Sequence, residues 1–169
     1  MIELTASKGI VEQTGIDFQL LSTILTTILE RAHGRKIYFK AQVHKCRQKD
    51  VSLCELHSKR KFKIQLDTCN TATRYQWTAL LHELRHCVQY NLFGFWPNTS
   101  VFKSFKQYYT AVEEVDARKA EKLYTEVRKI YELHIKALDK FKTLGLKNIK
   151  GLWLVIQTTI GAQKELRYN

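Results

Sequence analysis

The sequence predicts an α+β protein with the order N-terminal helix, small antiparallel sheet, helix with a His-Glu-x-x-His motif, glutamate-bearing helix and long C-terminal helical region. Three observations predict this class. Apolar residues recur at helical spacing in residues 17–30, they alternate with polar residues in 62–67, and helical spacing returns from residue 74 onward.

The length of 169 residues and the hydrophobic content of 44% allow one sizeable core and are short for two domains. We therefore expect a single domain over residues 1–169. Residues 1–70 would form a helix and a basic sheet, 71–145 the two motif-bearing helices, and 146–169 an apolar C-terminal segment. One proline and seven glycines argue against a disordered or low-complexity chain.

The first predicted helix covers residues 17–30. Its apolar residues follow one helical face and predict burial against the rest of the domain: Phe18, Leu20, Leu21, Ile24, Leu25, Ile28 and Leu29. This stretch is too short to span a membrane, and we expect no membrane partner.

The middle of the chain predicts strands at residues 36–42, 51–57 and 62–67. Polar residues 58–61 indicate a turn, so the last two strands would form a hairpin. In the last strand Phe62, Ile64 and Leu66 alternate with polar residues, which predicts one buried face and one solvated face.

The next helix is predicted at roughly residues 74–92. Thr73 and Gln76 fit a capping box at its start, and Gly94 is a natural stop. At about 100° per residue, His82 and His86 share one face. The apolar stripe lies on the opposite face and consists of Trp77, Leu80, Leu81, Leu84 and Val88.

His82, Glu83 and His86 form the most informative motif of the chain, His82-Glu83-Leu84-Arg85-His86. Two histidines four residues apart on a helix can bind one metal ion, and the glutamate between them can take a proton from a metal-bound water. This pattern is typical of zinc peptidases. The alternative is a helix with two surface histidines and a solvated glutamate.

A catalytic zinc needs a third protein ligand. A glycine and a histidine three and six residues after His86 would extend the motif, but Gln89 and Leu92 stand there, and the next histidine is His134. A glutamate from a second helix remains. Glu114 is the first candidate, because Glu113 fits a capping box with Thr110; Glu113 and Asp116 stay as alternatives.

From Thr110 the helical stripe continues to about residue 144, as one helix that projects or breaks. Residues 151–160 are apolar but too few to span a membrane. We expect them to pack on the core, with a partner-binding or autoinhibitory tail as the alternative.

On these residues the chain resembles the gluzincin metallopeptidases, and more narrowly the small single-domain peptidases of the ImmA/IrrE type. The resemblance is carried by residues 82–86 and by the E-x-x-A pattern of residues 114–117. Two positions depart from the family: Arg85 replaces a common glycine, and Arg118 replaces an Asp or Asn that orients a histidine ligand. Asp116 is a possible substitute for that Asp or Asn.

The resemblance implies a zinc endopeptidase of peptide or protein substrates, with His82, His86 and Glu114 as ligands and Glu83 as general base. It also implies that the strand at 62–67 lines the cleft and pairs with the substrate backbone, whereas an ordinary edge strand is the alternative. Four tyrosines are candidates by position for stabilising the oxyanion: Tyr108, Tyr109, Tyr75 and Tyr90.

The net charge is +12, and residues 31–63 carry eleven basic side chains against two acidic ones. This segment predicts contact with nucleic acid, although it would also suit acidic peptides or simple solubility. A rival hypothesis is therefore a basic nucleic-acid-binding protein, and a second rival is a peptidase-like regulator without catalysis.

Four cysteines form no C-x-x-C pair, and the N-terminus lacks the basic start and apolar segment of a signal peptide. We therefore expect reduced thiols in a cytoplasmic protein. A weaker hypothesis places a structural zinc between His44, Cys46, Cys54 and His57.

Overall fold

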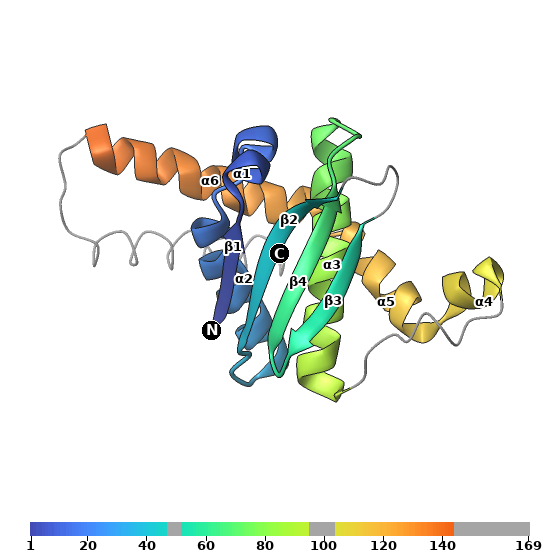
Figure 1. Ribbon diagram of the computed structural model, residues 1–169. Helices are drawn as coiled ribbons and strands as arrows, with labels where there is room; N and C mark the ends of the chain where they lie inside the picture. The colour runs from blue at the N-terminus through green and yellow to red at the C-terminus, as the bar shows by residue number, and fades with distance from the viewer. Residues whose placement is uncertain (47–51, 95–103, 144–169) are drawn as a thin grey trace, which may run out of the picture. The chain divides into compact units, whose positions relative to one another are not determined.

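The computed structural model describes residues 1–46, 52–94 and 104–143, and it confirms the α+β class (Figure 1). The described strands are β1 (Ile2–Ala6), β2 (Phe39–Cys46), β3 (Leu53–Ser58) and β4 (Lys61–Asp67). The described helices are α1 (Lys8–Thr14), α2 (Phe18–His33), α3 (Thr73–Phe93), α4 (Phe105–Thr110), α5 (Val112–Glu121) and α6 (Tyr124–Thr143). The chain divides into two compact units, residues 1–125 and 126–169, and the four described strands belong to the first.

The four strands form one mixed sheet with the order β1-β2-β4-β3. The predicted hairpin is confirmed, since β3 and β4 are antiparallel. The prediction of a wholly antiparallel sheet is wrong, because β2 pairs in parallel with both β1 and β4. For β1 and β2 the reason is the connectivity, because α1 and α2 lie between them and such a crossover returns the chain in the same direction. β4 is parallel to β2 because β3, its antiparallel hairpin partner, lies on the far side of β4 and not between the two.

β4 lies inside the sheet, with β2 on one side and β3 on the other. Its backbone is therefore paired along both edges, and the prediction that residues 62–67 take up a substrate strand is wrong. The alternation that predicted one buried face is confirmed, because Phe62, Ile64 and Leu66 are all buried. The edge strands are β1 and β3.

Strand β1 was not predicted from the sequence. Its signal is the alternation of Ile2 and Leu4, which are 3% and 2% exposed. Two hydroxyls of α2 accept hydrogen bonds from the backbone of β1: Thr26 from Ile2 N at 2.9 Å and Ser22 from Leu4 N at 2.8 Å. Helix α2 thereby satisfies donors of an edge strand that has only one neighbour.

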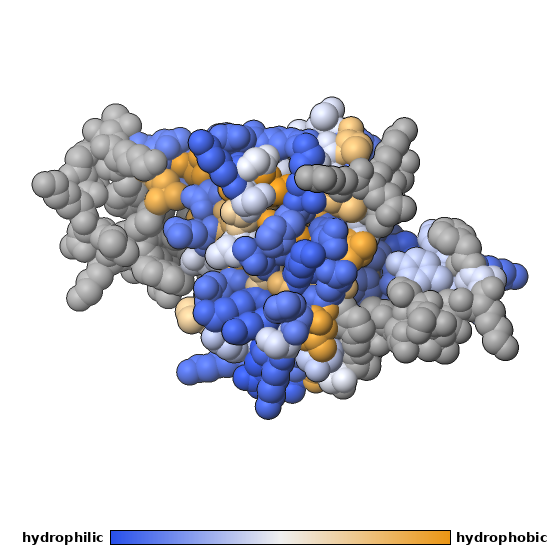
Figure 2. Space-filling model, in the orientation of Figure 1, coloured by the Kyte–Doolittle hydropathy of each residue, from blue (hydrophilic) through white to orange (hydrophobic). Residues whose placement is uncertain are grey.

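Helices α2 and α3 cover one face of the sheet (Figure 1). The other face is largely hydrophilic over the strands (Figure 2). The core lies between the helices and the sheet, and its fully or nearly fully buried side chains include Ile10, Leu21, Ile24, Phe39, Val43, Ile64, Leu66, Leu80 and Leu84. Because one face of α3 packs on the sheet, its opposite face, which carries His82 and His86, is the one that can form a site.

Both predicted capping boxes are wrong. Helix α3 begins after Ala72, without a side-chain cap, and Gln76 instead donates to the carbonyl of Asn70 at 3.2 Å. Thr110 ends α4, and its hydroxyl donates back to the Lys106 carbonyl at 2.9 Å. A threonine already inside one helix is not available to cap the next.

The predicted helical region from Thr110 breaks, which is one of the two predicted alternatives. Helix α5 begins after Ala111 and ends at Glu121, and α6 starts at Tyr124. The predicted end at residue 144 and the apolar residues 151–160 lie outside the described residues. None of the described helices combines the length and the hydrophobicity that a membrane span requires.

Replacing Asp17, the N-cap of α2, tests how much this cap stabilises the helix that packs against β1. The Asp17 carboxylate accepts hydrogen bonds from Gln19 N and Leu20 N, both at 3.0 Å. We expect Asp17→Ala to lower the free energy of unfolding by about 1 kcal/mol, measured by urea denaturation. Asp17→Asn is the matched control, because asparagine caps as well. Equal stability of the two variants would contradict the capping role.

Candidate metal centre

The two motif histidines lie one turn apart on the side of α3 that faces α5, where His82 is half-buried and His86 is buried. Their Nε2 atoms are 3.2 Å apart, and their ring centroids are 4.9 Å apart. The opposite side of the helix faces the core, as its spacing predicted, since five apolar residues there are buried: Trp77, Leu80, Leu81, Leu84 and Val88. Burial of that stripe turns both imidazoles toward α5.

Glu114 comes from the first turn of α5 and is 2% exposed. Its Oε2 atom lies 3.2 Å from His82 Nε2, and its Oε1 atom lies 3.4 Å from His86 Nε2. The alternatives lie elsewhere. Glu113 offers its backbone carbonyl to Gln89, and Asp116 pairs with Arg85.

The spacing of the three donors suits a tetrahedral metal ion. Ligands at about 2.0–2.1 Å from zinc are about 3.3–3.4 Å from one another in a tetrahedron. The two Nε2 atoms are 3.2 Å apart, and they lie 3.2 and 3.4 Å from different oxygens of the Glu114 carboxylate, so each of these contacts is close to that value. His82, His86 and Glu114 are also the only such group of histidine, cysteine and acidic residues in the described part of the chain.

The buried carboxylate also fits a cation. The Oε2 atom of Glu114 is buried, and among the described residues no group donates a hydrogen bond of good geometry to it. Burial raises the pKa of Glu114, but the side chains of His82 and His86 outweigh burial and hold this pKa at about 2. An ionised, incompletely satisfied carboxylate at this depth is stabilised by a positive charge between it and the imidazoles.

Gln89 fixes the orientation of the His86 ring through a hydrogen bond. Its amide nitrogen donates to the Glu113 carbonyl at 2.9 Å and to an Asp116 carboxylate oxygen at 2.8 Å. The amide oxygen therefore faces His86 Nδ1, 2.9 Å away, and accepts its hydrogen. This bond leaves the lone pair of Nε2 directed at the metal position.

Glu121 fixes the orientation of the His82 ring in the same way. Its Oε1 atom accepts a hydrogen bond from His82 Nδ1 at 2.7 Å. Burial lowers the pKa of His82, but Glu114, Glu83 and Glu121 more than reverse this effect and raise it. Glu121 was not predicted as a site residue, although it follows Glu114 by seven residues and so returns to the same face of α5 after two turns.

The two departures from the resembled family are accounted for by this arrangement. Arg85 donates to an Asp116 carboxylate oxygen at 2.7 Å, so Asp116 is bound on the side of His86 and does not orient His82. The prediction that Asp116 substitutes for the missing Asp or Asn is therefore wrong, because Glu121 is the residue that accepts the hydrogen bond from His82 Nδ1. Arg118 turns away and stacks over the ring of Tyr109 at 3.8 Å.

Glu83 is 6% exposed and lies among these groups. Burial raises its pKa to about 7, although His82 and His86 pull it the other way. A carboxylate in so dry a place is more basic than one in water, which suits a group that exchanges a proton.

Of the four tyrosine candidates, Tyr108 is placed at the site. Its hydroxyl donates a hydrogen bond to the Glu114 carboxylate, and burial together with that carboxylate raises the pKa of Tyr108. Tyr109 is 50% exposed and lies under Arg118. The ring of Tyr90 packs edge-on against Phe62 beside the sheet, and Tyr75 is half-buried on α3.

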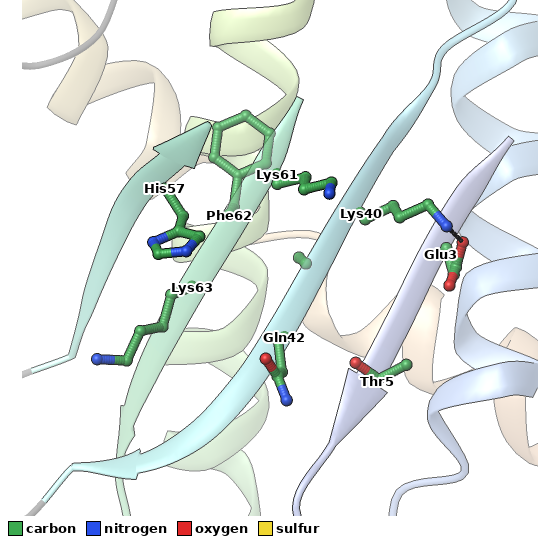
Figure 3. Close-up of a pocket in the computed structure, with 9 residues that line it drawn as sticks. Glu3, Thr5, Lys40, Gln42, His57, Lys61, Phe62 and Lys63 are labelled. Carbon is green, nitrogen blue, oxygen red and sulfur yellow. Dashed lines mark ion pairs between the residues drawn. The ribbon is translucent and has the colours of Figure 1, made fainter. Parts of the chain in front are cut away.

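The basic residues of the sheet face a different surface. A hollow of about 350 Å³ on the open face of the sheet is lined by Lys40, Lys61 and Lys63, with Glu3 among them (Figure 3). Lys40 pairs with Glu3 at 2.5 Å, and Lys63 pairs with Glu55 at 3.5 Å. Part of the positive charge is thus neutralised locally, and nucleic-acid contact through residues 31–63 stays a prediction.

The weaker zinc hypothesis fails for geometric reasons. Cys54 turns toward α3, where its sulfur lies 3.4 Å from that of Cys87, whereas His57 lines the open face of the sheet. Within the described residues these side chains do not gather with His44 and Cys46 into a metal-binding group.

Comparison with known proteins finds no matching family model, no similar curated protein and no similar solved structure.

Removing a ligand tests the centre directly. We expect purified protein to bind about one zinc ion per chain, and His86→Ala and Glu114→Gln to lose it, measured by metal analysis after dialysis. Glu113→Gln is the matched control on α5 and keeps the metal. Retention of zinc by both ligand variants would contradict this site.

Removing the orienting carboxylate has a smaller effect. Glu121→Gln leaves the three donors in place but weakens the hold on His82 Nδ1, so we expect zinc affinity to fall roughly 10- to 100-fold. Competition with a chromogenic chelator measures this change. An affinity equal to that of Glu113→Gln would show that Glu121 does not orient the ligand.

Proposed function

We propose that this protein is a zinc-dependent peptidase of the gluzincin type. The observation that carries the proposal is the convergence of His82, His86 and Glu114, whose possible ligand atoms all lie within 4.8 Å of one another. Support comes from the hydrogen bonds that both imidazoles donate through Nδ1, and from the buried Glu83 next to the first ligand. A purely structural zinc site uses four protein ligands, whereas three leave a position open for water.

The protein side chains divide the work of hydrolysis. Zinc, when bound, supplies a coordinated water of lowered pKa and polarises the scissile carbonyl. Glu83 accepts the proton of the attacking water and returns it to the leaving amine. Glu121 and Gln89 keep the imidazoles in their productive tautomers. Tyr108, whose hydroxyl is already beside Glu114, is the nearest phenol for the developing oxyanion.

An extended peptide would add to strand β3 rather than to β4. β3 is the edge strand next to β4, and it contacts α3, the helix that carries the His-Glu-x-x-His motif. The unpaired backbone of an edge strand can bind a peptide through main-chain hydrogen bonds. A substrate held there lies along the same helix that carries Glu83.

Two features favour this function over an inactive regulator. The sequence hint for lost catalysis was Arg118, but Glu121 supplies the carboxylate that Arg118 replaces. Glu83 also retains its place next to His82 in a buried setting. A metal-binding regulator would have no use for that carboxylate.

The test of catalysis is Glu83→Gln. The variant keeps all three ligands, so it should bind zinc as wild type does, while hydrolysis of a quenched-fluorescent peptide library should fall about 10²- to 10⁴-fold. Glu12→Gln, on exposed α1, is the control and should stay fully active. Undiminished hydrolysis in zinc-loaded Glu83→Gln would overturn the assignment of the general base.

Tyr108→Phe separates transition-state stabilisation from metal binding. The hydroxyl is absent but the ring remains, so we expect kcat to fall roughly 10- to 1000-fold, with KM and zinc content little changed. Tyr109→Phe is the matched control. An unchanged kcat would exclude Tyr108 from the oxyanion site.

A further inference from the structure

Two cysteines from different elements meet beside the metal centre without belonging to it. Cys54 lies on the edge strand β3, and Cys87 lies on α3 directly after His86. Their sulfur atoms are 3.4 Å apart, and both are free thiols. Cys87 is fully buried, whereas Cys54 is half-buried.

We propose that Cys54 and Cys87 are an oxidation site that forms an intrachain disulfide with a hydroperoxide as oxidant. The bond would tie the edge strand to the residue that follows a proposed metal ligand. The inference depends only on the two sulfurs, and it holds whether or not the protein hydrolyses peptides.

The reaction runs in two balanced steps. The sulfur of Cys54, the more accessible of the two, attacks the peroxide; an S–O bond forms, the O–O bond breaks and one water or alcohol leaves. The sulfur of Cys87 then attacks that of Cys54, so that the S–S bond forms and the S–O bond breaks, and a second water leaves with the Cys87 proton. The two thiols lose two electrons in all, and the peroxide gains them.

The geometry requires only a small movement. A disulfide has a sulfur–sulfur distance of about 2.05 Å, so the sulfurs must approach by roughly 1.4 Å. β3 can supply this movement, because among the described strands it pairs only with β4, and this pairing shifts register between Leu56 and Ser58. α3 stays in place, since its inner side chains are part of the core.

The other two cysteines are separate from this pair. Cys46 is buried at the end of β2, and Cys69 is exposed after β4. Only Cys69 is open to a second chain, and Cys69→Ser therefore removes the main route to intermolecular disulfides. That variant has three thiols and is the background for the experiment.

The experiment treats folded Cys69→Ser protein with hydrogen peroxide and counts the remaining thiols under denaturing conditions. We expect three thiols to become one in a monomeric chain, with a proteolytic peptide containing Cys54 joined to one containing Cys87 and released by dithiothreitol. A further Cys46→Ser substitution should leave the crosslink intact, whereas a further Cys54→Ser should abolish it.

Three results would overturn the proposal. One is that Cys54 is oxidised to sulfinic acid while Cys87 keeps its thiol. Another is a disulfide that joins either cysteine to Cys46. The third is a crosslink that forms only in urea-unfolded protein, which would show that the folded pair does not react. Cys54→Ser at a half-buried position keeps the test valid even where a change at buried Cys87 prevents folding.

Discussion

The contact between α3 and α5 is the interaction on which the metal centre depends. Neither helix alone carries three ligands, and Glu114 is brought to the histidines by polar bonds between the two helices. Gln89 and Arg85 of α3 both bind Asp116 of α5, and Gln89 also binds a backbone carbonyl of α5. The two bonds to the Asp116 carboxylate are charge-assisted and therefore stronger than neutral ones, and together with the bond to the backbone carbonyl they set the spacing and the rotation of α5.

This contact places several ionisable groups where water is scarce. Glu83 and Glu114 are almost fully buried within reach of two imidazoles. Their pKa values move in opposite directions, because Glu114 faces both histidines closely while burial dominates at Glu83. Such divergence between neighbouring carboxyl groups is typical of sites where one group holds a charge and the other exchanges a proton. The arrangement costs folding free energy that a bound cation would offset.

The sheet supports the centre from behind. β4 is central and its inner side chains are buried, so α3 packs on a rigid surface, whereas β3 pairs only with β4 among the described strands. The edge is therefore the place where a peptide strand or an oxidant can act close to α3. The open face of the sheet carries the lysines, away from the metal ligands, which separates the charge of the chain from its proposed chemistry.

Local spacing within the sequence determined the helix register, the shared face of His82 and His86 and the hairpin, because each depends on a period of 3.6 or 2 residues. Glu114 lies beside the histidines as predicted, but the capping box on which its choice over Glu113 rested does not form. Long-range contacts decided the rest. Three features join residues far apart in the chain: the parallel pairing of β2, the internal position of β4, and the contact of Cys54 with Cys87. A repeat of 2 or 3.6 residues in the sequence cannot predict such contacts. Glu121 lies between the two cases: its spacing from Glu114 was visible, but only the packing of α5 on α3 brought it to His82.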